Sequence, residues 1–256
     1  MPALPSPLSS PTDWSANPVI AAAVWRAHQL GCAGAARGVP SQFAALDAEL
    51  PDGGWPRHAL TELLAQSFGI GELRLLMPAL AQITRAGKPV MWIAPPALPY
   101  APALASAGVA LEHLLLLQPG NDRDRWWAIE QALKSGSIGA VLAWLPEERR
   151  LAANDRLRRL QLAAAGSEGL CFLFRPAAAR VQASPASLRI VLAPAEDGQF
   201  SLVLLKRRGP PRAAPIVIEL SGGPITRAAP PAASHAAVVL PVTAHRRVDV
   251  AANDAA

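Results

Sequence analysis

Five short apolar segments alternate with longer amphipathic segments between residues 59 and 175. Strands that are apolar along their whole length are buried on both faces, and helices between them favour a parallel sheet covered on both sides. The pattern therefore predicts an α/β fold with a mostly parallel central sheet flanked by helices. The strands are expected at residues 59–64, 89–94, 113–118, 139–145 and 170–175.

The segments between these strands carry apolar residues at helical spacing. Residues 71–85 predict one helix, in which Pro78 should introduce a bend because proline lacks a backbone N–H. Residues 122–135 predict another, with Asp122 as a plausible N-cap. The two remaining helices are expected at residues 99–107 and 147–165.

The chain outside this alternating region has a different character. After residue 185, strand-like runs at 187–195, 199–208 and 215–220 predict an antiparallel hairpin appended to the sheet. Low-complexity Pro/Ser and Ala/Pro stretches at the two ends predict disorder. The expected parts are a disordered segment at 1–18, a helix and linker at 19–37, a domain at 38–220 and a disordered tail at 221–256. The short N-terminal helix either packs on the domain or anchors a partner.

Composition excludes several classes of protein. Among 256 residues the net charge is +5, which permits contact with nucleic acid or an acidic partner without requiring it. Two cysteines without C-x-x-C spacing, and histidines spread along the chain, give no metal site. The start of the sequence lacks the features of a signal peptide, and no apolar run reaches the ~18 residues that cross a bilayer. We therefore expect a cytoplasmic protein without contact to a membrane.

The stretch ELLAQSFGIGELRLL, residues 62–76, has the order strand, glycine-containing loop and helix that is typical of a phosphate-binding loop. Such a loop needs a Lys against the phosphates and a Ser or Thr on magnesium. Here Glu72 takes the Lys position and Leu73 the Ser/Thr position. A carboxylate repels a triphosphate, and leucine offers no ligand. Gly69 and Gly71 still precede a helix, so weak nucleotide binding stays open.

Residues 38–195 resemble the RecA-like core. The resemblance rests on the run from Asp47 to Pro56, which ends in Gly-Gly-Trp-Pro, and on GVALEHLLLLQP at 108–119. It implies that the catalytic acid of the second strand falls on Pro96 or its neighbour Pro95, and the magnesium-supporting acid of the fourth on Trp144. With Glu72 and Leu73, these departures predict a non-enzyme with a degenerate ATP site, without cofactor or metal.

Among RecA-like proteins, the chain resembles the ImuA family of translesion-synthesis accessory proteins and the related cell-division inhibitor SulA. The resemblance rests on Trp92 to Pro95 and on Ala-Trp-Leu-Pro at 143–146. The Trp25-Arg26 helix and the long stretch after residue 186 fit ImuA better. ImuA membership implies a non-catalytic role in SOS-induced translesion DNA synthesis. The implied partners are an ImuB-like Y-family polymerase homologue, an error-prone C-family DNA polymerase reached through that complex, and RecA. The alternative is SulA-like inhibition of cell division through binding to the tubulin-like ring protein.

Three groups of residues are candidate contact points. The basic side chains either lie on solvated surfaces or contact DNA weakly or an acidic partner. Trp126 and Trp127 are adjacent, so one should be buried and the other exposed, where it could anchor a partner. Phe68 and Ile70 in the glycine loop either pack locally or form an apolar surface. The basic candidates are Arg149, Arg156 and Arg159 on the last predicted helix, and Lys206, Arg207, Arg208 and Arg212 at the hairpin turn.

Overall fold

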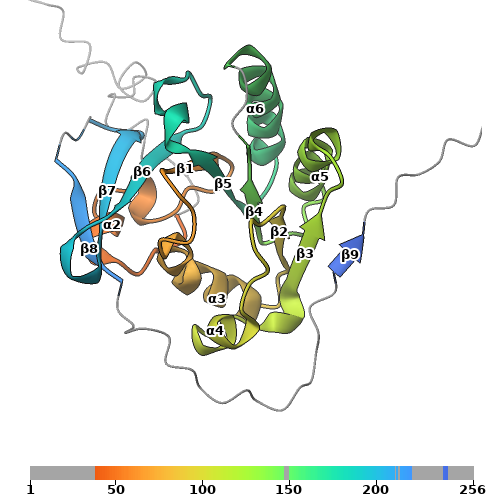
Figure 1. Ribbon diagram of the computed structural model, residues 1–256, viewed down its shortest axis with the longest axis horizontal. Coiled ribbons are helices and arrows are strands. Elements are labelled where there is room, and N and C mark those ends of the chain that lie inside the picture. The colour runs from red at the N-terminus through yellow and green to blue at the C-terminus, as the bar shows by residue number, and fades with distance from the viewer. Residues whose placement is uncertain (1–37, 147–149, 211, 213, 221–238, 242–256) are drawn as a thin grey trace, which may run out of the picture. The chain divides into compact units, whose positions relative to one another are not determined.

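The computed structural model describes residues 38–146, 150–210, 212, 214–220 and 239–241. These residues form one sheet whose strands follow the apolar segments of the sequence (Figure 1). The strands are β1 Leu60–Ala65, β2 Val90–Ile93, β3 Leu114–Gln118, β4 Ala140–Trp144, β5 Leu170–Pro176, β6 Leu188–Pro194, β7 Gln199–Lys206, β8 Ile216–Glu219 and β9 Val239–Pro241.

The order of the strands in the sheet is β8-β7-β6-β1-β5-β4-β2-β3-β9. In this order, every pair of neighbouring strands from β6 through β1, β5, β4, β2 and β3 to β9 is parallel. The pairs β6–β7 and β7–β8 are antiparallel. The prediction of a mostly parallel sheet that ends in C-terminal antiparallel strands is therefore confirmed.

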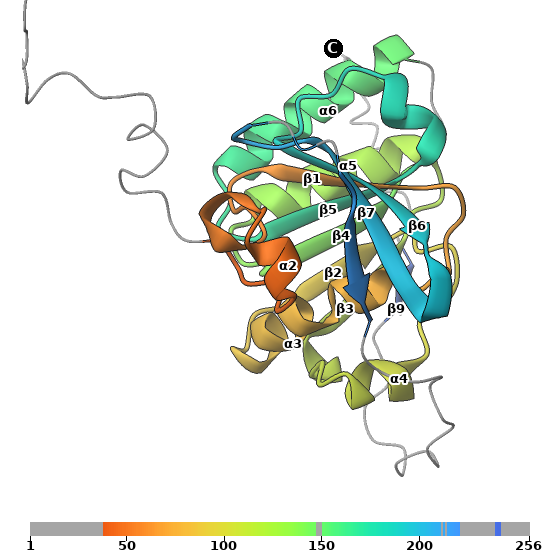
Figure 2. The ribbon, with the colours of Figure 1, turned by 90° about the vertical axis from the view of Figure 1, so that its left-hand side faces the viewer.

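Helices cover both faces of the parallel part of the sheet. In Figures 1 and 2, α3 and α4 lie on one face, and α5 and α6 lie on the other. Two separate hydrophobic clusters match these two layers. This is the arrangement expected for strands that are apolar on both faces. The helices are α2 Ala44–Asp47, α3 Met77–Arg85, α4 Ala101–Ser106, α5 Asp122–Lys134 and α6 Arg150–Ala165.

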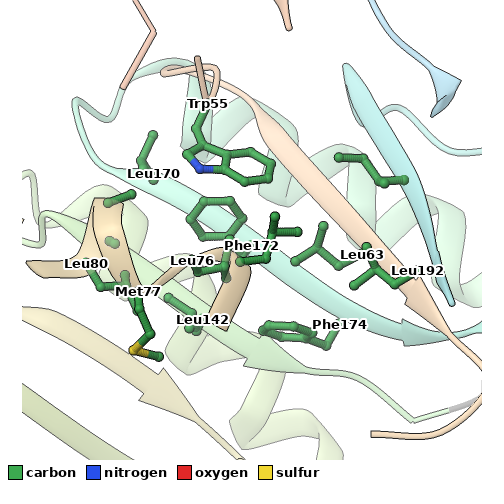
Figure 3. Close-up of a cluster of buried hydrophobic side chains, with 14 of the residues drawn as sticks. Trp55, Leu63, Leu76, Met77, Leu80, Leu142, Leu170, Phe172, Phe174 and Leu192 are labelled. Atoms are coloured by element: carbon green, nitrogen blue, oxygen red, sulfur yellow. The ribbon is translucent and has the colours of Figure 1, made fainter. Parts of the chain in front are cut away.

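The larger cluster lies between the sheet and α3 (Figure 3). Trp55, from the turn before β1, is fully buried and meets Phe172 of β5 edge-on, with ring centroids 5.1 Å apart. Leu63, Leu76 and further labelled side chains surround this pair. Large fully buried side chains such as these each contribute about 1.5–3 kcal/mol through burial, so the pre-strand turn is part of the core.

The first helix after the glycine loop differs from the prediction. Residues 71–85 do not form one bent helix: the 3-10 helix η3, Glu72–Leu75, is followed by α3, which begins at Met77. Pro78 therefore lies in the first turn of α3. There a missing N–H costs nothing, because the first N–H groups of a helix have no partner within it.

The start of α5 also differs in one residue. Asn121, and not Asp122, is the N-cap, and its side-chain oxygen accepts the N–H of Asp124 at 2.9 Å. Either residue type suits the position, so the sequence pattern alone did not separate them. Within α5, Trp126 is buried and Trp127 is 59% exposed, as their adjacency predicted.

The predictions for residues 1–18 and 19–37 lie outside the described residues, as does most of 221–256. Within that last range, residues 239–241 are described and form β9. The strand pairs with β3 at the edge of the sheet, where an unpaired strand offers free N–H and C=O groups. Disorder elsewhere in 221–256 stays a prediction.

Candidate functional site

The glycine loop lies between β1 and η3, at the carboxyl edge of the parallel strands. Gly69 and Gly71 have φ angles of 85° and 100°, in the left-handed region that favours glycine. A side chain on Gly71 would also contact the ring of Phe200 in β7. Because β1 is paired on both sides, by β5 and β6, this loop lies in the middle of the sheet. Ligands of open α/β sheets bind at this edge.

Glu72 occupies this loop with its own carboxylate. The residue is only 3% exposed, and its two oxygens accept the N–H of Gly69 at 3.0 and 3.1 Å. A buried carboxylate needs hydrogen-bond donors, and a loop amide is the type of donor that would otherwise face a phosphate. The sequence predicted repulsion of a triphosphate; the structure adds an internal anion bonded to the loop. Leu73, its neighbour, packs half-buried against the core.

Trp144 lies at the end of β4, at the same carboxyl edge of the sheet as the glycine loop. Its ring stacks on Phe174 with centroids 4.6 Å apart and an angle of 8°, and it lies 5.6 Å from Trp92. Phe68 from the glycine loop meets Phe174 edge-on at 6.3 Å. Four aromatic rings therefore form a continuous row across β2, β4, β5 and the loop after β1. Of the two readings for Phe68, local packing is the one observed.

The loop after β2, residues 94–100, is held in place at its base. Ala94 donates its N–H to Leu117 O at 2.8 Å, and Gln118 Nε2 donates to Pro95 O at 3.1 Å. Pro96, expected at the position of the catalytic acid, is exposed. Beyond it, Leu98 and Tyr100 are 72% and 54% exposed. The loop, bonded at its base to β3, thus presents two large apolar side chains to solvent.

The sequence analysis did not single out Leu98 or Tyr100. A signal was present: the run PPALPY places both residues between or beside prolines. Prolines at this density prevent the run from forming a helix interior or a central strand. Its large apolar side chains therefore lack the regular element that would bury them.

The arginines of α6 contact the neighbouring helix. Arg156 lies over the ring of Trp126, 5.5 Å from its centroid. Arg159 Nη2 is 2.6 Å from Glu130 Oε2 on α5. The pKa of Glu130 is lowered, first by the hydrogen bond from Lys134 and also by Arg159. Arg149 lies outside the described residues.

The basic residues near the hairpin turn also contact their own chain. Arg207 pairs with Glu49 at 2.8 Å, and Arg212 pairs with the same carboxylate. Lys206 donates to Ser184 O at 2.9 Å, whereas Arg208 is exposed. These partners differ from those of the α6 arginines, so the two basic groups do not form one site. Contact with DNA or an acidic partner stays a prediction for each.

A buried ionic cluster was not anticipated. Glu62, in the middle of β1, accepts from Arg175 at 3.0 Å, Arg189 at 2.7 Å and Ser184 at 2.7 Å. All three charged side chains are less than 9% exposed. Arg189 also donates to the carbonyl of Ala179 at 2.8 Å. The cluster fastens the connection between β5 and β6 onto β1, which indicates a structural role.

In the described part of the chain, no group of three or more His, Cys, Asp or Glu residues could hold a metal ion. No helix among those residues is long and apolar enough to cross a membrane.

Comparison with known proteins finds a similarity over part of the chain. The family model described as "Cell division inhibitor SulA" matches residues 64–170. Proteins named cell division inhibitor SulA from Yersinia pestis (strain Pestoides F) and Yersinia pseudotuberculosis serotype O:1b (strain IP 31758) are each 32% identical over 103 residues. The match covers 40% of this chain and 59% of the length of each relative.

These matches contradict the expected role in translesion synthesis. They also contradict the expected partners, which were an ImuB-like polymerase homologue, an error-prone C-family polymerase and RecA. The features that favoured ImuA, Trp25-Arg26 and the stretch after residue 186, lie outside the matched segment, whereas the shared motifs lie mostly within it. Residues 64–170 of this chain are similar to the family model described as "Cell division inhibitor SulA" and to relatives of that name.

Proposed function

We propose that this protein inhibits cell division by binding the tubulin-like ring protein FtsZ, as a stoichiometric binder and not as an enzyme. The observation that carries the proposal is the family match over residues 64–170. That segment begins at the end of β1 and ends at the start of β5. It therefore includes the glycine loop, the loop after β2 and both helical layers.

The finer assignment of the fold as a RecA-like core with a degenerate ATP site belongs to the same proposal. A glycine loop follows a central parallel strand, as in a phosphate-binding domain. Glu72 already binds the loop amide of Gly69, and Trp144 replaces the expected acid. The groups that hydrolysis requires are absent from these positions, which supports a role in binding only.

Leu98 and Tyr100 are the proposed contact residues. Both lie within the matched segment, and both are exposed on a loop fixed by Ala94 and Gln118. Aromatic side chains such as Tyr100 are common anchors at protein interfaces, and a loop held at its base loses less conformational entropy when it binds.

The test measures assembly of FtsZ by sedimentation in the presence of the purified full-length chain. Wild type should reduce the sedimented fraction in proportion to its concentration. The double variant Leu98→Ser/Tyr100→Ala should lose about tenfold or more in potency, since two anchors contribute several kcal/mol. Leu162→Ser is the matched control: Leu162 is 77% exposed on α6, within the matched segment but on another element.

Expression in growing cells gives an independent readout. Wild type and Leu162→Ser should produce filamentous cells, whereas the double variant should not. The proposed function would be ruled out if expression of the wild-type protein left cell length unchanged and the purified protein left FtsZ assembly unaffected. Full potency of the double variant would remove Leu98 and Tyr100 from the contact surface and leave the function itself in place.

A further inference from the structure

The antiparallel strands β7 and β8 extend the sheet beyond α5 and α6 (Figure 1). Leu173 of β5 packs into the core layer of these two helices, and in the register it shares a face with Glu62 of β1 and Arg189 of β6. Side chains alternate along a strand, so Val191 and its partner Val203 continue the same face. The face that α5 and α6 cover on the parallel strands therefore continues onto β7 and β8, where these helices do not cover it.

Apolar side chains dominate this open face. Val217 is 49% exposed and Leu205 is 42% exposed, although both are next to core residues in the chain. Val191 and Val203, which are partners in the register, are half-buried on the same face. Exposed apolar side chains that gather on one surface indicate an interaction site, whereas single ones do not. We call this surface the β6–β8 face; it consists of Val191, Ala193, Ser201, Val203, Leu205 and Val217.

The β6–β8 face carries opposite charges at its two ends. Glu219 is exposed where β8 ends, opposite Gln199 at the start of β7. Lys206 is exposed at the other end of β7, opposite Arg189, and its Nζ donates to Ser184 O at 2.9 Å. Seven residue steps along β7, or about 23 Å, separate these two ends. The face is therefore acidic at one end, apolar in the middle and basic at the other end.

We propose that the β6–β8 face is a self-association surface, on which a second copy of the chain packs its own β6–β8 face. Stacked sheets keep their strands within about 30° of each other, about 10 Å apart. A two-fold axis across the strands turns the second copy end to end. Glu219 of each copy then faces the Lys206 end of the other copy, and the apolar side chains meet in the middle. Without this reversal, like charges would face each other, which opposes association.

The size of the face indicates how tightly the two copies associate. Three strands span about 15 Å by 23 Å, which is smaller than the ~800 Å² per partner of a stable complex. We therefore expect a reversible dimer whose population rises with concentration. β6 begins at Leu188, after the segment that is similar to the SulA relatives. The inference thus goes beyond FtsZ binding and does not depend on it.

The first test is the molar mass of the full-length chain, measured by light scattering across a range of concentrations. Wild type should change from monomer to dimer as concentration rises. Val217→Ser should weaken association about tenfold or more, because an isologous interface loses the apolar contact twice. Leu162→Ser is the control: Leu162 is 77% exposed on α6, and the variant should associate like wild type. A wild-type protein that stays monomeric at all concentrations would overturn the proposal and leave this face to a different partner.

A charge exchange separates this dimer from any other. Lys206→Glu and Glu219→Lys should each associate about tenfold or more weakly than wild type, because like charges then face each other. An equimolar mixture of the two variants should dimerise again, since one copy is acidic at both ends and the other is basic at both ends. Loss of a structural contact, such as that of Lys206 with Ser184, would not be restored by mixing. The proposal is overturned if either variant alone dimerises like wild type, or if the mixture of the folded variants stays monomeric.

Discussion

Glu72 accepts the N–H of Gly69 with both carboxylate oxygens, at 3.0 and 3.1 Å, from a position that is 3% exposed. The carboxylate therefore stabilises the loop at Gly69, three residues before Glu72 in the chain. In the pattern of a phosphate loop this position would hold a lysine. The substitution thus replaces a ligand-binding contact with an internal one, and the loop keeps its left-handed glycines.

Glu72→Ala should lower the free energy of unfolding by about 1–2 kcal/mol, because a charge-assisted hydrogen bond is lost. Glu72→Gln should cost less, since the amide oxygen still accepts the Gly69 N–H. Urea unfolding, followed by tryptophan fluorescence, measures both values. Glu112→Gln, an exposed carboxylate, is the control and should stay within about 0.5 kcal/mol of wild type. Equal stability of Glu72→Ala and wild type would contradict the proposed loop contact.

Substitutions of Trp144 test whether the row of four aromatic rings stabilises the fold. Trp144→Ala should destabilise by about 3–5 kcal/mol, because it removes the stack on Phe174 and leaves a cavity. Trp144→Phe should cost much less: it keeps a ring on Phe174 and removes an indole N–H that is buried without an acceptor among the described residues. Trp144→Asp, which restores the acid of the ATPase pattern, should prevent folding. Thermal unfolding by circular dichroism ranks the three. A stable, cooperative fold for Trp144→Asp would show that this position is not packed as described.

The strands could be predicted from sequence because runs such as LLLLQ at 114–118 are apolar on both faces, and burial decides their place. The role of Glu72 could not, since a sequence shows its charge but not that its side chain turns back to the backbone. Glu62 and Arg189 are separated by 127 positions, so their contact depends on β1 and β6 becoming neighbours. The exposure of Leu98 likewise could be recognised only from the folded structure.

The buried cluster around Glu62 leads to a prediction about the β5–β6 connection. Glu62→Gln should destabilise by about 3–5 kcal/mol, because Arg175 and Arg189 then remain buried without a counter-charge. Replacing Glu62, Arg175 and Arg189 together by Leu, Met and Met should restore much of this loss, since no unpaired charge remains. Urea unfolding of both variants provides the comparison. If the triple variant is no more stable than Glu62→Gln, the unpaired charges are not the cause of the loss.

Glu130 predicts a pH-dependent contribution to stability. Its pKa is lowered from the ordinary value of 4.5 by the hydrogen bond from Lys134 and by Arg159 of α6. A carboxyl group whose pKa is lower in the folded state stabilises the fold above its unfolded pKa, and this contribution is lost as pH falls through the folded value. Glu130→Gln should therefore lower the thermal midpoint at pH 7. The loss in the free energy of unfolding should be less than about 1 kcal/mol, because Lys134 and Arg159 are exposed. Below the lowered pKa, the two proteins should unfold at the same temperature.

Arg158→Gln, an exposed residue one position from Arg159, controls for loss of charge on α6. A difference between wild type and Glu130→Gln that persists unchanged into strong acid would show that the charge of Glu130 is not its source.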